Sequence, residues 1–164
     1  MINYDTPNIT IPEFIDFVNL AQIDPKVIVE IGCMDAADAI LLKETYPLAR
    51  TLAIEGLLEN YETFKDRTDI EAINRIIASY DGTITFHKKT INGIHGIYNR
   101  GDNFGTETII NSPCSTLLSL AKEFDIPAID VLKLDVEGAT LDVLESAKEF
   151  LQKIKIMHIE TETY

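Results

Sequence analysis

The sequence predicts one α/β domain in which helices cover both faces of a doubly wound, mainly parallel sheet. Three observations support this fold class. Short apolar runs rich in β-branched residues alternate along the chain with segments of helical periodicity. The 164 residues suit one domain and are few for two, so we expect a single domain over residues 1–164. No internal repeat, low-complexity tract or linker interrupts the pattern.

The first part of the chain predicts helices and strands in alternation. Apolar residues recur at helical spacing in an N-terminal helical segment, residues 1–26. The apolar run that follows reads as a buried strand because it is rich in Val and Ile and stops at Gly32. In chain order the predicted elements are the helix 11–21, the strand 27–31, the helix 35–46, the strand 51–55 and a helix that carries Leu57, Tyr61 and Phe64.

The rest of the chain continues the alternation after one irregular stretch. Asp81-Gly82 is a hairpin signal between predicted strands at 75–79 and 83–86. Residues 87–113 hold four glycines and no periodicity, which predicts a long substrate-side loop, since long loops in compact domains are usually functional or disordered. The remaining predicted elements are a helix near 115–124, the strand 130–134, the helix 139–152 and the strand 155–159.

The residues that follow each predicted strand are the candidate site. In an open parallel sheet, ligands bind beyond the carboxyl ends of the strands, where the strand order reverses. Most of the residues at these positions are acidic, and this regularity is the main functional clue in the pattern. The residues are Glu30, Gly32, Glu55, Ser79, Asp135, Glu137, Glu160 and Glu162.

Gly32 and Glu55 favour a nucleoside ligand when they are taken together. A glycine directly after a buried strand lets a ligand approach the backbone, although a plain tight turn would also explain it. An acid at the end of the second strand can accept hydrogen bonds from both ribose hydroxyls, and a solvated glutamate is the alternative. The turn lacks the G-x-G-x-x-G pattern of dinucleotide-binding proteins, which argues against NAD.

The string Leu132–Gly138 is the most specific in the chain. Asp135 and Glu137 place two carboxylates at the mouth of a central strand, where they can act as general base, orient a hydroxyl or hold a divalent ion. One of them could instead cap the following helix. His95, in the glycine-rich stretch, has the side chain of a competent base at neutral pH, but a lone loop histidine is more often solvated.

Composition excludes several other classes of function. The formal net charge of −13 argues against a nucleic-acid partner, because phosphate backbones bind clustered Lys and Arg. Cys33 and Cys114 have no metal-ligand spacing, and no metal is predicted. The sequence shows neither a signal peptide nor an apolar run of membrane-spanning length, so we expect a cytoplasmic protein without membrane contact.

At the motif Lys133-Leu134-Asp135-Val136-Glu137-Gly138-Ala139 the sequence resembles the FkbM-type methyltransferases, a family of S-adenosylmethionine-dependent enzymes. The resemblance runs from Val27 to Glu160. It includes a first cofactor motif at 29–35, a second at Ile54-Glu55 with 59–61, and the segments 78–86 and 115–117. It implies a Rossmann-like sheet of the class I methyltransferase type and methyl transfer to a hydroxyl of a sugar or another small natural product.

The resemblance also implies roles for individual residues. The cofactor S-adenosylmethionine would contact Asp135 and the residues of the first two motifs, with Glu30 and Gly32 around its methionine part and Glu55 at its ribose. Asp35, in the first motif, would also bind the cofactor. Ser79 would lie near its adenine. Asp135 and Glu137 would lie where the methyl group meets the acceptor. For the base we propose Asp135 or His95, with Glu137 orienting the acceptor.

Three departures from the family pattern keep a second function open. Ala36 stands where a glycine is common, Thr140 replaces a second glutamate, and two strands expected after the fifth are missing from the sequence. The alternatives are a cofactor-binding module without turnover and an NAD-type oxidoreductase, which the missing glycine pattern disfavours. With the last strand at the sheet edge, we expect either a fragment of a longer protein or a homodimer that pairs through residues 155–160.

Overall fold

The computed structural model describes residues 9–91, 93–99, 101 and 105–161. Its centre is a five-stranded sheet in the order β3-β2-β1-β7-β8, and every neighbouring pair is parallel. The strands are β1 (Val27–Ile31), β2 (Arg50–Glu55), β3 (Glu71–Asn74), β7 (Ile129–Leu134) and β8 (Ile154–Ile159). This confirms the predicted parallel α/β sheet and places β8 at an edge. The first eight residues of the predicted N-terminal segment, part of the predicted loop and Glu162 lie outside the described residues.

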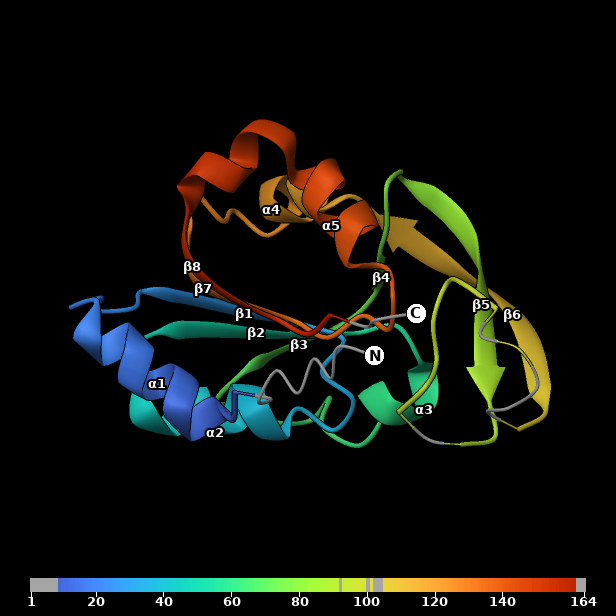
Figure 1. Ribbon diagram of the computed structural model, residues 1–164, viewed down its shortest axis with the longest axis horizontal. Helices are drawn as coiled ribbons and strands as arrows, with labels where there is room; N and C mark the ends of the chain where they lie inside the picture. Colours follow the sequence, from blue (N-terminus) through green and yellow to red (C-terminus); the bar gives the residue numbers. More distant parts are fainter. Residues whose placement is uncertain (1–8, 92, 100, 102–104, 162–164) are drawn as a thin grey trace, which may run out of the picture.

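Helices cover both faces of this sheet (Figure 1). On one face lie α1 (Ile11–Leu20) and α2 (Ala37–Thr45), and on the other lie α4 (Leu117–Glu123) and α5 (Thr140–Ala147), which runs on into the 3-10 helix Lys148–Lys153. A single turn, α3 (Leu58–Tyr61), follows β2. The predicted helices are therefore present, with the third shorter than its apolar spacing suggested.

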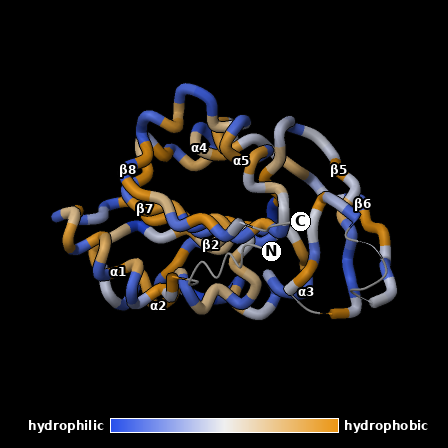
Figure 2. The backbone as a smooth tube through the Cα atoms, in the orientation of Figure 1, coloured by the Kyte–Doolittle hydropathy of each residue, from blue (hydrophilic) through white to orange (hydrophobic). Residues whose placement is uncertain are grey.

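Two apolar clusters fix these layers. Ile28 and Val131 of the sheet pack against Phe14, Val18 and Leu42 from α1 and α2. On the opposite face a larger cluster joins the sheet to α4 and α5 through residues including Leu117, Leu120, Val143 and Ala147. Figure 2 shows that the hydrophobic residues are concentrated in the central strands. The sheet is apolar on both faces, as a parallel sheet covered by helices must be.

Local signals explain where α1 begins. The Thr10 side chain accepts a hydrogen bond from the Glu13 backbone N–H, and the Glu13 carboxylate accepts one from the Thr10 backbone N–H at 2.8 Å. Pro12 lies in the first turn, where a missing N–H costs nothing. The helix therefore begins where its capping groups are.

The segment between β3 and α4 differs from the sequence predictions in three respects: the third strand, the hairpin and the long loop. The third strand of the main sheet is Glu71–Asn74, so the prediction that residues 75–79 form it is wrong. Residues 76–77 instead form β4 of a separate sheet, with β5 (Gly82–Lys89) and β6 (Glu107–Ser115) in the order β4-β6-β5. Asp81-Gly82 is not a hairpin turn, because β4 and β5 each pair with β6 and not with one another.

The predicted loop at 87–113 is partly strand. Its two ends belong to β5 and β6, which pair antiparallel from Gly82↔Cys114 to Lys89↔Glu107. Only the residues between Lys89 and Glu107 connect the strands. Figure 1 shows this two-stranded arm beside the carboxyl ends of the main sheet, next to α3. The arm therefore supplies one side of the region where a ligand is expected.

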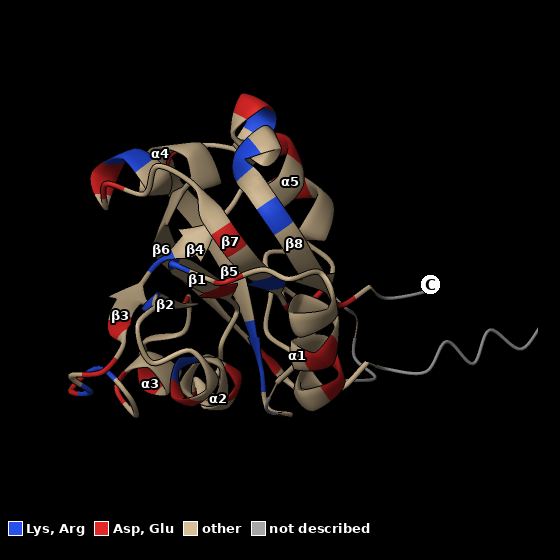
Figure 3. Cartoon of the chain, turned by 90° about the vertical axis from the view of Figure 1, so that its left-hand side faces the viewer, with Lys and Arg blue, Asp and Glu red and all other residues tan. Residues whose placement is uncertain are grey.

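Charged side chains are spread over the outer elements of the fold. Figure 3 shows Asp and Glu on helices on both sides of the sheet, without a broad basic face in that view. Within the described ranges, none of the helices combines the length and apolarity that crossing a bilayer requires.

Candidate functional site

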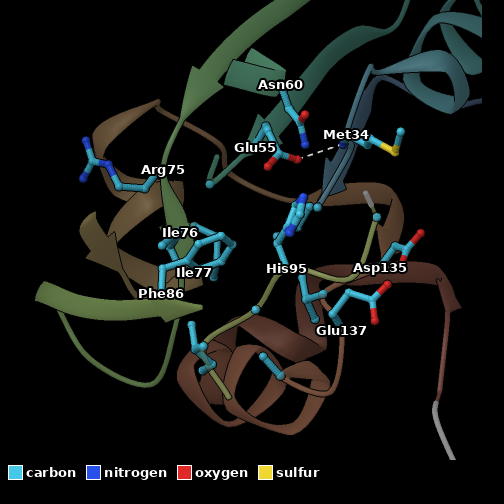
Figure 4. A pocket seen from close by; sticks show the side chains of 18 residues that line it. Met34, Glu55, Asn60, Arg75, Ile76, Ile77, Phe86, His95, Asp135 and Glu137 are labelled. Atoms are coloured by element: carbon cyan, nitrogen blue, oxygen red, sulfur yellow. Dashed lines mark hydrogen bonds between the residues drawn. The ribbon is translucent and has the colours of Figure 1, made fainter. Parts of the chain in front are cut away.

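A pocket lies at the carboxyl ends of β1, β2 and β7, where the strand order reverses between β1 and β7. It encloses about 670 Å³, counting the space open to solvent at its mouth, and this is within the usual range for small-molecule sites. Figure 4 shows polar side chains on the strand-end side and an apolar group opposite. The described lining residues are Ile31, Gly32, Met34, Glu55, Gly56, Asn60, Arg75, Ile76, Ile77, Phe86, Gly93, His95, Gly96, Ile97, Asp135, Val136, Glu137 and Ala139.

Gly32 joins the strand ends at the base of the pocket. Its N–H donates to the Ile54 carbonyl at 2.9 Å, and the Asp135 N–H donates to the Ile31 carbonyl at 3.0 Å. Its φ is +80°, and a Cβ at this position would lie 1.8 Å from the Asp135 carbonyl oxygen. Any side chain would force β1 and β7 apart, so glycine is required here for close packing as well as for its backbone angle.

Glu55 presents a buried carboxylate to the pocket from the end of β2. It accepts hydrogen bonds from the Leu57 N–H at 2.7 Å and the Met34 N–H at 2.8 Å. Burial raises the pKa of Glu55, while the bonds from Leu57, Met34 and the Asn60 side chain act against that rise. The backbone bonds fix the direction of the carboxylate at the edge of the pocket.

Glu30 lies beneath the pocket and is not among its described lining residues. It is 1% exposed, and its carboxylate accepts from the Ala39 N–H at 2.7 Å and from Lys133 Nζ at 3.0 Å. Burial raises the pKa of Glu30 to about 7, against the opposing attraction of Lys133. The structure thus gives Glu30 a supporting contact with α2 and β7.

Lys133 links the buried Glu30 carboxylate to Asp135 in the pocket lining. Its ammonium lies 3.0 Å from Asp38 as well as from Glu30, and 3.5 Å from Asp135. Burial alone would lower the pKa of Lys133, but the charges of Glu30 and Asp135 outweigh burial and raise it. The ammonium therefore stays charged and compensates the carboxylates around it.

Asp35 and Ser79 also lie away from the pocket lining. Asp35 is exposed and accepts from the Ala37 N–H at 3.1 Å just before α2, so its side chain is engaged in the local turn. Ser79 is exposed because β3 ends at Asn74 and the chain has already entered the second sheet. Neither contributes a described side chain to the pocket.

Asp135 and Glu137 both line the pocket after β7, and the turn that carries them has unusual backbone angles. Glu137 has φ +48° and Gly138 has φ +87°. A left-handed glutamate costs roughly 1 kcal/mol or more and is typical of functional sites. The turn brings two carboxylates from one strand end into the same pocket.

His95 reaches the pocket from the segment between β5 and β6. The Lys89 backbone N–H donates to His95 Nδ1 at 3.1 Å. Burial lowers the pKa of His95, the Lys88 charge lowers it further, and Glu59 acts in the opposite direction. The structure therefore brings together His95, Gly32, Glu55, Asp135 and Glu137, which lie far apart in the sequence.

Sequence reasoning missed the apolar wall of the pocket. Ile76, Ile77 and Phe86 form it, with Ile97 from the segment after β5. A strand boundary misplaced by a few residues hid the first two, and Arg75 with them. The pair Ile76-Ile77 directly after a polar strand end was the available signal. The result is a pocket with carboxylates on one side and aliphatic and aromatic surface on the other, which suits a flat apolar ring joined to polar and cationic groups.

Comparison with known families gives one result that bears on this pocket. Residues 17–164 match the family model described as methyltransferase FkbM domain. No curated protein and no solved structure matches the chain. The matched range includes every residue that lines the pocket.

Proposed function

Because the chain belongs to the FkbM methyltransferase family, we propose that it is an S-adenosylmethionine-dependent O-methyltransferase. The proposed acceptor is a hydroxyl of a sugar or another small natural product. One observation carries the proposal: Gly32, Glu55 and Asp135, from three neighbouring strand ends, line a single pocket at the point where the strand order reverses.

The chemistry of the lining residues fits the cofactor. Glu55 offers a fixed carboxylate to the two ribose hydroxyls, and the wall of Ile76, Ile77 and Phe86 offers an apolar surface to the adenine. The proposed place of the adenine thus moves from Ser79 to this wall. Asp135 and Glu137 add negative charge on the opposite side, which complements an ammonium and a sulfonium group.

The residues after β7 are assigned to the transfer step. When bound, S-adenosylmethionine would supply the methyl group from its positively charged sulfonium sulfur, and this sulfur would become a neutral thioether. Asp135 accepts the proton of the acceptor hydroxyl, and Glu137 orients the acceptor. Lys133 keeps the Asp135 side chain in place from below through its contact at 3.5 Å.

Calorimetry with S-adenosylhomocysteine tests the cofactor assignment. Replacement of Glu55 with Ala should weaken binding by about 1–3 kcal/mol, because charge-assisted hydrogen bonds to the ribose are lost. Glu62→Ala is the matched control, since Glu62 is an exposed glutamate paired with Lys65 outside the pocket. Unchanged affinity in a folded Glu55→Ala protein would contradict the assignment.

A labelled-methyl assay on mixed glycans and small hydroxylated compounds tests turnover. At saturating cofactor, Asp135→Asn should lower the transfer rate by roughly 10²-fold or more, as expected for loss of a general base. A wild-type rate in this variant would show that Asp135 is not the base. Cofactor binding with no methylated product from any acceptor would favour the alternative of a binding module without turnover.

A further inference from the structure

The orientation of the His95 ring is fixed by a backbone group. The Lys89 N–H donates to His95 Nδ1, and Lys89 is the last residue of β5, paired with Glu107 in β6. The Lys89 side chain is itself buried, with its ammonium 2.9 Å from the Glu107 carboxylate and 3.0 Å from the Gly101 carbonyl oxygen. The donor that faces Nδ1 therefore belongs to a rigid part of the arm.

This hydrogen bond determines where the proton of a neutral imidazole resides. A neutral ring carries one N–H, and the nitrogen that accepts a hydrogen bond must be the unprotonated one. With Nδ1 as acceptor, Nε2 carries the proton. Burial and the nearby Lys88 charge both lower the pKa of His95, which keeps the ring neutral at pH 7.

The segment that carries His95 packs against the turn after β7. Gly96 exchanges two backbone hydrogen bonds with His87, at 2.8 and 3.3 Å, and a Cβ on Gly96 would lie 3.1 Å from the Glu137 carbonyl oxygen. Figure 4 shows the His95 ring within the pocket, in the view that also contains Asp135 and Glu137. His95 and Asp135 thus line the same pocket from opposite segments.

We propose that His95 is not the general base, and that its Nε2–H donates a hydrogen bond that positions the acceptor oxygen while Asp135 alone receives the proton. This inference rests on the proposed methyl transfer. A hydroxyl oxygen has one hydrogen and two lone pairs. If Asp135 takes the hydrogen and His95 engages one lone pair, the remaining lone pair is the one directed at the methyl carbon. The new O–CH₃ bond forms from that pair as the C–S bond breaks and its electrons stay on sulfur.

Nitrogen-15 NMR of the imidazole groups tests the tautomer without any acceptor. The wild-type protein has three histidines, and the His95 signals are those missing from the spectrum of a His95→Gln protein. At pH 7 we expect a neutral ring with the proton on Nε2. A proton on Nδ1, or a charged ring, would overturn the proposal, and this result does not depend on whether methyl transfer occurs.

Two amide substitutions test the role in turnover. His95→Gln can place an N–H near the position of Nε2, whereas His95→Asn can replace only the contact with the Lys89 N–H. We expect kcat/KM to be about tenfold lower in the Asn protein than in the Gln protein, the amount that one positioned hydrogen bond represents. Equal losses in the two folded variants would contradict donation from Nε2. Failure of all variants and of the wild type to transfer methyl groups would contradict the proposed function itself, while the NMR result would still decide the tautomer.

Discussion

Glu30 and Glu55 show how one residue position separates an acid that lines the pocket from an acid that lies buried beside it. Glu30 lies one residue before the end of β1, and its side chain turns toward α2 and Lys133. Glu55 is the last residue of β2, and its side chain enters the pocket. Sequence reasoning located both acids correctly at strand ends. It could not separate them, because alternate residues of a strand point to opposite faces and the sequence does not show which of the two acids faces the ligand side.

The buried Glu30 carboxyl makes stability depend on pH in a specific direction. Its pKa in the folded protein is about 7, compared with 4.5 for an unperturbed glutamate. Between these values the unfolded chain has released the proton and the folded protein keeps it, so rising pH favours unfolding. The stability that this group contributes is fully present below pH 4.5 and is lost as the pH rises through 7.

We expect the unfolding free energy of the wild type, minus that of Glu30→Gln, to decrease by about 3 kcal/mol between pH 4 and pH 8. Urea denaturation over this range measures the difference, and groups common to both proteins cancel. Glu62→Gln, at an exposed position, shows the effect of an unrelated glutamate substitution in the same series. A difference that stays constant with pH would show that Glu30 ionises equally in both states.

At the scale of elements, the predictable parts are those with strong apolar patterns. β1, β2 and β7 are buried on both faces and were located to within a residue. β6 could not be predicted, because it contains Asn111 and Pro113 and its polar and apolar residues do not alternate in the sequence. Its partner β5 is separated from it by a long connection, and a pairing register across such a distance leaves no local signal in the sequence.

A side-chain hydrogen bond from Tyr98 ties the connection between β5 and β6 to α5. Tyr98 Oη donates to Asp142 Oδ2 at 2.7 Å, and its neighbours Gly96 and Ile97 line the pocket. This connection belongs to the stretch 87–113, for which the sequence predicted a substrate-side loop. A ligand in the pocket should hold it closed, and loss of the tyrosine hydroxyl should let it open more often.

We therefore expect Tyr98→Phe to increase the rate of subtilisin cleavage between β5 and β6 by about threefold to tenfold, as the loss of one hydrogen bond implies. S-adenosylhomocysteine should slow the cleavage in both proteins. Tyr80→Phe is the control, because the Tyr80 hydroxyl bonds to the Thr83 carbonyl away from this connection. Resistance of the wild type without ligand, equal to its resistance with ligand, would contradict a ligand-ordered segment.

At the scale of the whole molecule, β8 leaves one edge of the main sheet open among the described strands. Met157 on this strand is 41% exposed. Lys155 is exposed too, but its ammonium is drawn to Asp130 at 2.6 Å. Unpaired backbone groups on such an edge favour pairing with another chain, and two copies can pair about a two-fold axis because each edge complements itself.

We predict a homodimer at micromolar concentration that pairs through β8. The Glu160 N–H donates to the Leu134 carbonyl of β7, so by alternation along the strand the Met157 N–H points to the open edge. Light scattering measures the mass of the wild type and of a Met157→Pro protein, in which proline removes one donor from that edge. The variant should be monomeric while its circular dichroism remains that of a folded α/β protein. A monomeric wild type would contradict the prediction, as would a dimer that the proline leaves intact.

The second sheet begins and ends at neighbouring points of the main fold. β4 pairs with the last two residues of β6, and the Ala78 N–H donates to the Ser115 carbonyl at 3.0 Å. The chain therefore leaves the main fold after β4 and returns to it at the end of β6, beside the point where it left. The residues between these points contribute Phe86, His95 and Ile97 to the pocket. The parallel sheet keeps its own packing clusters without that part. Phe86 and Cys114 of this part pack with Leu57 and Ile76. We expect that a different segment grafted in place of residues 79–114, if it keeps that packing, would present a new wall to the pocket while Gly32, Glu55 and Asp135 stay where the strands hold them.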